Sequence, residues 1–262
     1  MRTVCGVARR VRSLVPRGAR QPGRVAEVLP LAGGRRPLLG EHMGEQRRGD
    51  ARLDQVDRTA CGSAVLVALA AWADPAEMLR LVGEAVAGAA TASGTTVADA
   101  HGVASGFGAR YDARQQQVHR QTNRFWPRAL GTTPWGMVRW LRRHVPGAGP
   151  YRVRLVDDRS RADLTAALDE ATAALAAGRP VPMLVGSLVP RHYVLALGVL
   201  DADSWRVYEP GSGRVRALDL RLVRQRRTAP VLGFHRLHAL LLPPPGVGAR
   251  RTGSTAARRL EG

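Results

Sequence analysis

The spacing of apolar positions predicts three helices in the first half of the central region. Residues 61–73 form an almost continuous apolar run that ends at Asp74-Pro75, which predicts a buried helix. A second helix is expected to run from Pro75 to about residue 87, with proline in its first turn. A third begins after Thr133, whose hydroxyl can cap it. Residues 88–125 show no clear core stripe, so we expect a surface excursion or an unrecognised helix there.

The apolar period then shortens from that of a helix to that of a strand. Residues 151–158 alternate and predict a strand, and residues 160–178 predict a helix that Ser160 caps and Gly178 ends. Short apolar or alternating runs follow, separated by turn-forming residues such as "DADS" and "GSG", which favour antiparallel hairpins. These strand-like runs cover residues 180–186, 192–200, 205–210, 214–220 and 231–242. Helices followed by an antiparallel sheet predict an α+β domain.

Composition divides the 262 residues into three parts. Residues 1–50 are rich in Arg, Gly and Pro with little periodicity, and we expect a disordered extension. Residues 51–244 are expected to form one domain, and residues 245–262 a flexible basic tail. The chain contains no uncharged apolar run long enough to span a membrane and no secretory signal at its N-terminus, so we expect a cytoplasmic protein.

The net charge of +19 is carried by arginine alone, because the chain has no lysine. Such a charge would attract anionic partners, including nucleic acid or lipid headgroups. However, no nucleic-acid-binding motif accompanies the arginines, and they are not interleaved with aromatic residues. We therefore interpret the charge as a compositional bias and keep an arginine-driven nucleic-acid binder as a lesser alternative. The sequence does not indicate an oligomeric state.

The two cysteines, Cys5 and Cys61, cannot form a disulfide framework or a cysteine-rich zinc site. His235 and His238 could share a helical face, but no carboxylate or cysteine beside them completes a metal site. We therefore expect no metal and no cofactor.

A set of residues that suits thiol chemistry is spread along the chain. Cys61 opens a predicted helix, whose positive end favours a thiolate. Gln55 lies six residues upstream, and its amide could bind an oxyanion together with the backbone N–H of Cys61. His192 opens the strand "HYVLALGVL" and is the candidate base, while Glu209 ends the next strand and is the candidate orienting acid. Each of these residues could instead be structural or solvated.

The motifs "Q-x5-CGSA", "GRPVPMLVG", "RHYVLALGV" and "WRVYEPGSGRV" resemble those of papain-like cysteine peptidases of the C39-like type, over roughly residues 53–220. The resemblance implies a papain-like fold, with an N-terminal helical part packed on a C-terminal antiparallel sheet. It also implies that Cys61 is the nucleophile, His192 the base, Glu209 the third member and Gln55 the oxyanion donor. His192 and Glu209 follow Cys61 by about 130–150 residues, as in papain-type enzymes.

The sequence departs from the family pattern at two positions. The third catalytic member is usually Asp or Asn, where this chain has Glu209, and Ser63 stands where proline often follows Cys-Gly. A two-residue turn at Ala202-Asp203 would also place Glu209 opposite Ala196, about 13 Å along the strand from His192 at 3.3 Å per residue. A bulge, a shifted turn or strong twist must close that distance if Glu209 is the partner.

The combined expectation is a thiol-dependent hydrolase, cysteine peptidase-like, that acts on a peptide or other amide bond. An acyl or amide transferase would use the same residues, with an amine in place of water. A catalytically inactive papain-fold binding module is a further alternative. The sequence leaves the substrate undetermined.

Overall fold

A computed structural model describes residues 1–14, 38–83, 100–123 and 131–244 of the chain. Its helices and strands have these bounds: α1 Val4–Leu14, β1 Gly44–Glu45, β2 Arg47–Arg48, β3 Ala51–Arg52, α2 Cys61–Ala73, α3 Pro75–Val82, α4 Ala100–Thr122, α5 Pro134–His144, the short 3-10 turn η2 Pro146–Ala148, β4 Arg152–Leu155, α6 Arg161–Ala176, β5 Val181–Gly186, β6 Pro190–Asp201, β7 Ser204–Glu209, β8 Arg214–Asp219, α7 Leu220–Gln225, α8 Ala229–Leu232 and β9 Arg236–Leu242.

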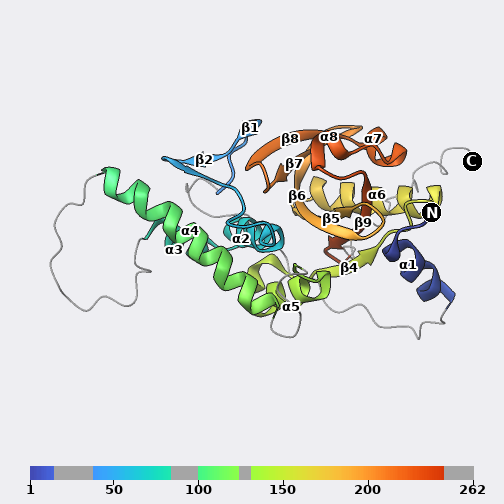
Figure 1. Ribbon diagram of the computed structural model, residues 1–262, viewed down its shortest axis with the longest axis horizontal. Coiled ribbons are helices and arrows are strands. Elements are labelled where there is room, and N and C mark those ends of the chain that lie inside the picture. The colour runs from blue at the N-terminus through green and yellow to red at the C-terminus, as the bar shows by residue number, and fades with distance from the viewer. Residues whose placement is uncertain (15–37, 84–99, 124–130, 245–262) are drawn as a thin grey trace, which may run out of the picture.

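The centre of the molecule is a seven-stranded antiparallel sheet in the order β1-β8-β7-β6-β5-β9-β4. One face packs against α2, α4 and α5, with α3 lying against α2 and α4, and the other face packs against α6, α7 and α8 (Figure 1). Side chains along β6 alternate between the two cores: Tyr193 and Leu195 face α2, while Val194 and Ala196 face α6. The chain is therefore a mixed helix and antiparallel-sheet protein, as the change of period predicted.

The central helix α2 explains why the sequence around Cys61 is so apolar. Eleven of its thirteen residues are buried, from Cys61 to Ala71. Asp74 ends α2 and caps α3, because its side chain accepts a hydrogen bond from the N–H of Ala76. Gly83, with φ of +83°, ends α3 earlier than the predicted residue 87, which lies outside the described residues. Thr133 and Ser160 cap α5 and α6, as predicted.

The structure corrects the prediction that residues 1–50 are disordered. Val4–Leu14 is a helix that packs beside β4 and β9, and residues 44–48 contribute the strands β1 and β2. Residues 15–37 and the predicted tail 245–262 lie outside the described residues. Within the part of the chain that the structure describes, no helix is both long and apolar enough to cross a membrane.

Candidate active site

Cys61 is the first residue of α2, at the point where this helix meets the sheet. Ala60, the residue before it, provides no side-chain cap for the helix, so the first N–H groups of α2 have no capping side chain. The positive end of the helix therefore lies at the sulfur, where it favours a negative charge. The side chain is largely buried, with 5% of the residue surface exposed.

His192 and Glu209 lie on the neighbouring strands β6 and β7 and contact each other directly. The distance from His192 Nε2 to Glu209 Oε1 is 2.7 Å. Phe234 packs against the imidazole, with ring centroids 5.9 Å apart. Because Glu209 occupies Nε2, Nδ1 is the ring nitrogen that remains available to Cys61, whose interaction with the imidazole raises the pKa of His192. The structure thus brings three of the four predicted site residues into one contiguous group.

Two irregularities in β6 bring Glu209 within reach of His192. Ala196 pairs with Val207, and the next pair joins Gly198 to Arg206, which leaves one extra residue in β6. A second extra residue lies between Val199 and Asp201. Each extra residue shifts the pairing of β7 with β6 by one position. The distance along the strand between Glu209 and His192 is therefore about 7 Å instead of about 13 Å. The two side chains are long enough to span it.

The turn that follows Glu209 binds both oxygens of its carboxylate. Its Oε1 accepts the N–H of Gly211 at 2.7 Å, and its Oε2 accepts the N–H of Ser212 at 2.8 Å. Burial raises the pKa of this carboxyl, but the hydrogen bonds from His192 and Ser212 and the charge of His192 outweigh burial and lower the pKa to about 2. Glu209 is therefore ionised at any physiological pH.

The environment of His192 favours the protonated imidazole. Burial by itself lowers the pKa of His192, but the hydrogen bonds and negative charges of Cys61 and Glu209 raise it to about 9. An imidazolium that a carboxylate holds close to a cysteine is the charge arrangement that thiol catalysis uses.

These pKa shifts make the stability of the protein depend on pH. The raised pKa of His192 contributes stability that is complete below 6.5 and lost as pH rises through 9, and the lowered pKa of Glu209 contributes stability that is complete above 4.5 and lost as pH falls through 2. Both contributions are complete only between pH 4.5 and 6.5. We expect the difference in melting temperature between wild type and His192→Asn to be largest there and to shrink towards pH 9. Thermal unfolding followed by circular dichroism measures it, and a difference independent of pH would contradict the pairing.

Gln55 lies beside the Glu209 turn, but its amide is only partly available to an oxyanion. Its backbone N–H donates to Pro210 O at 2.9 Å, which fixes it next to the residue that follows Glu209. Its side-chain Nε2 donates to Asp57 O at 2.7 Å, and its Oε1 is buried with no hydrogen-bond partner. One N–H of the amide therefore remains unused. The structure places Gln55 beside the turn that follows Glu209. The hydrogen bonds described for Gln55 do not include Cys61, so its role as an oxyanion donor stays a prediction.

Gln115 holds the loop on both sides of Gln55, and sequence patterns did not identify it. This fully buried side chain of α4 accepts the N–H of Val56 at 3.1 Å and donates to Asp54 O at 2.9 Å. Tyr208 supports the same loop, because its hydroxyl donates to Leu53 O at 2.6 Å. Gln115 could have been identified only from its position on the buried face of α4, and the sequence patterns did not predict that helix.

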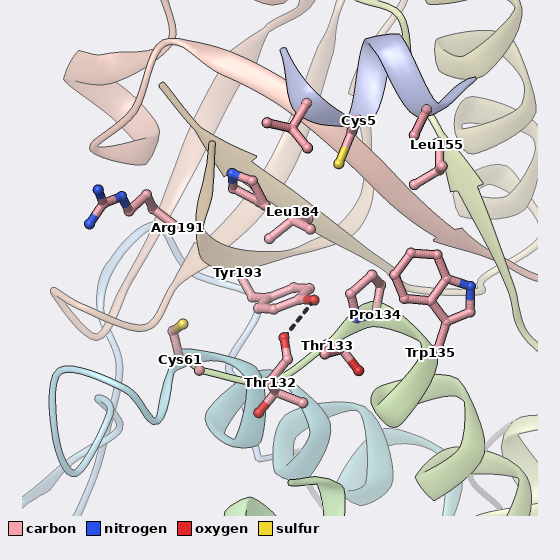
Figure 2. Close-up of a pocket in the computed structure, with 14 residues that line it drawn as sticks. Cys5, Cys61, Thr132, Thr133, Pro134, Trp135, Leu155, Leu184, Arg191 and Tyr193 are labelled. Atoms are coloured by element: carbon pink, nitrogen blue, oxygen red, sulfur yellow. Dashed lines mark hydrogen bonds between the residues drawn. The ribbon is translucent and has the colours of Figure 1, made fainter. Parts of the chain in front are cut away.

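An apolar cavity of about 330 Å³ adjoins Cys61 (Figure 2). Its lining includes Leu155, Leu184 and Trp135, and α1 contributes Val4 and Cys5. In the view of Figure 2, Cys61 lies at one end and the indole of Trp135 at the other. A substrate held at Cys61 could therefore place an apolar group in this cavity.

Gly62 allows the start of α2 to lie close to the wall of the cavity. A Cβ at this position would lie 3.1 Å from Thr132 Cβ and 3.3 Å from Tyr193 Cδ2. The Tyr193 hydroxyl in turn donates to Thr132 O at 3.0 Å (Figure 2). Thr132 and Tyr193 are two further lining residues that the sequence analysis did not single out.

Among the described residues, Cys5 and His238 do not add a second reactive centre. Burial raises the pKa of Cys5 to about 11, so its thiol stays protonated at neutral pH. His238 is buried, and its Nε2 pairs with Ser187 O at 3.2 Å. Among the described residues no group of three or more His, Cys, Asp or Glu side chains could hold a metal ion.

Comparison of the chain with protein-family models, with curated proteins and with solved structures finds no match.

Proposed function

We propose that the protein is a thiol hydrolase of papain-like fold that cleaves a peptide or other amide bond. The observation that carries the proposal is the position of His192, which bonds to Glu209 at 2.7 Å and lies close enough to Cys61 for the cysteine to raise the pKa of the imidazole. A nucleophile, a base and an orienting acid in contact form the arrangement that nucleophilic catalysis requires. A cysteine-bearing helix packed on an antiparallel sheet that carries His and the acid on adjacent strands also supports the fold assignment.

The residues of the site divide the reaction into two steps. The Cys61 thiolate attacks the substrate carbonyl, and the oxyanion that forms accepts hydrogen bonds from the Cys61 N–H and from the unused N–H of Gln55. His192 then gives its proton to the leaving amine, which departs and leaves a thioester on Cys61. Water, deprotonated by His192, attacks the thioester and releases the acid. An amine in place of this water would make the same site a transferase.

The cavity beside Cys61 narrows the substrate class. Its walls are largely aliphatic and aromatic, so burial of an apolar side chain or acyl group next to the scissile bond would strengthen binding. We propose a substrate with such a group beside the amide that is cleaved.

Labelling by a thiol-directed covalent inhibitor tests the proposal. We expect wild type to be modified at Cys61 near neutral pH and Cys61→Ser to be unmodified. Cys5→Ser is the matched control and should label like wild type, because burial keeps the Cys5 thiol protonated. Intact-mass measurement with peptide mapping identifies the modified residue. Equal labelling of Cys61→Ser and wild type would contradict the assignment of the nucleophile.

A further inference from the structure

Helix α1 packs against the domain through its polar side. Thr3 and Gly6 are buried there, and a Cβ on Gly6 would lie 3.1 Å from Asp157 Oδ1, so the helix lies close to the domain. Arg9 adds an ion pair of 3.1 Å to Asp163. These polar contacts hold α1 together with the partly buried Cys5, which packs against the core.

Three valines of α1 face outward. Val4, Val7 and Val11 have the spacing of one helical stripe, and they are 57%, 51% and 58% exposed. A surface helix ordinarily directs such a stripe towards the core. The reversed orientation leaves an apolar surface that the described domain does not cover.

The turn between β5 and β6 extends this surface. The N–H of Val4 donates to Leu188 O at 3.1 Å, and Leu188 and Val189 are 45% and 39% exposed. We call the set Val4, Val7, Val11, Leu188 and Val189 the apolar ridge. The ridge combines one side of a helix with the tip of a hairpin.

Arginines with unpaired guanidinium groups lie beside the ridge. A hollow of about 490 Å³ next to Leu188 is lined by Arg159, Arg226 and Arg227. Within the described part of the chain, none of these three side chains makes a hydrogen bond or ion pair. The backbone of Arg226 is left-handed, with φ of 57°. The acidic residues nearby do not compensate, because Asp157, Asp158 and Asp163 are each paired with an arginine. The surface beside the ridge is therefore cationic.

We propose that the apolar ridge and these arginines form a docking surface for a membrane that contains anionic lipids. Exposed aliphatic side chains flanked by arginine match the boundary between acyl chains and phosphate headgroups, and the net charge of +19 adds long-range attraction. A second copy of the chain fits this surface poorly, because pairing two copies of the ridge would bring their unpaired arginines together. Guanidinium groups bind phosphate oxygens in pairs, which suits lipid headgroups.

Sedimentation of the full chain with vesicles tests the apolar part of the proposal. We expect binding to vesicles that contain phosphatidylglycerol, much weaker binding to phosphatidylcholine alone, and loss of binding at high salt. Val7→Ser combined with Val11→Ser should lower the partition coefficient at least tenfold. Val199→Ser combined with Leu200→Ser is the control, because these exposed residues lie towards the opposite end of β6 and should leave binding unchanged.

Two arginine variants test the charged part. Arg226→Gln combined with Arg227→Gln should lower the partition coefficient by about 25-fold, at roughly fivefold per arginine near a surface. Arg142→Gln combined with Arg143→Gln removes the same charge from the exposed end of α5 and should have a much smaller effect. Failure of wild type to bind anionic vesicles would overturn the proposal. A concentration-dependent dimer that Val7→Ser with Val11→Ser abolishes would overturn it as well and assign the ridge to a second copy.

Discussion

Replacing His192 by alanine should slow the alkylation of Cys61 by iodoacetamide by about 100-fold at pH 6, because an ordinary cysteine with a pKa near 8.5 is only about 0.3% thiolate at that pH. In the wild-type protein the imidazole of His192 keeps its positive charge up to about pH 9. A positive charge beside a cysteine favours the thiolate, which is the form that iodoacetamide alkylates. Without the imidazolium, only the helix end remains to favour the anion.

Rates of mass gain at several iodoacetamide concentrations give the second-order rate constant. His235→Ala is the matched control, because it removes a histidine from the exposed hollow beside Arg226 and leaves His192 in place. Thermal unfolding of both variants establishes that they are folded at the temperature of the assay. Equal rate constants for wild type and His192→Ala would indicate that Cys61 is an ordinary buried thiol. That result would favour an inactive binding module over a hydrolase.

Much of the fold could be predicted because its signals are local. The apolar run from Cys61 to Ala73, the stop at Asp74-Pro75 and the capping residue Thr133 each act within a turn or two of the chain. The alternating segments and the turns between them likewise predicted the hairpins from β5 to β8. Local patterns were enough here because neighbouring residues along the chain are also neighbours in these elements.

Helices α1 and α4 are among those that the sequence patterns did not place, because their buried faces are not apolar stripes. The buried face of α4 includes Phe107, Tyr111, Gln115 and Val118, and a polar glutamine interrupts the stripe. That glutamine is buried because it binds the backbone of the loop before α2, a partner about sixty positions away in the sequence. In α1 the valines face outward, so the helix has no buried apolar stripe from which it could have been predicted.

The contact between His192 and Glu209 depends on details that residue patterns do not encode. The sequence placed both residues on adjacent strands, but a regular register leaves them too far apart. The first bulge in β6 lies at Leu197, directly before Gly198, and a glycine inside a strand is a general sign of a bulge that does not fix the register. The second bulge lies at Leu200, which has no glycine or proline beside it. The sequence could therefore name the partners of Cys61 without establishing that they meet.

Replacing Glu209 by glutamine should move the loss of positive charge on His192 to lower pH by about one to two units, because an adjacent carboxylate raises an imidazole pKa by about that amount. The readout is the ratio of the alkylation rates of Cys61 with iodoacetate and iodoacetamide. The anionic reagent is attracted by an imidazolium and the neutral one is not, so the ratio reports the charge of His192. In wild type the ratio should fall with a midpoint near pH 9.

The glutamine variant also disturbs the hydrogen bonds between residue 209 and the turn that follows it. A second variant separates this disturbance from the loss of the negative charge. One carboxylate oxygen of Glu209 accepts the N–H of Gly211 and the other accepts that of Ser212, so an amide must turn its own N–H group towards one of these donors. Glu209→Ala removes the conflict and should shift the midpoint in the same direction. Glu45→Gln removes an exposed carboxylate paired with Arg47 and should leave the midpoint unchanged. If all three variants retain the wild-type midpoint, Glu209 does not set the charge of His192, and the third member of the proposed site must be sought elsewhere.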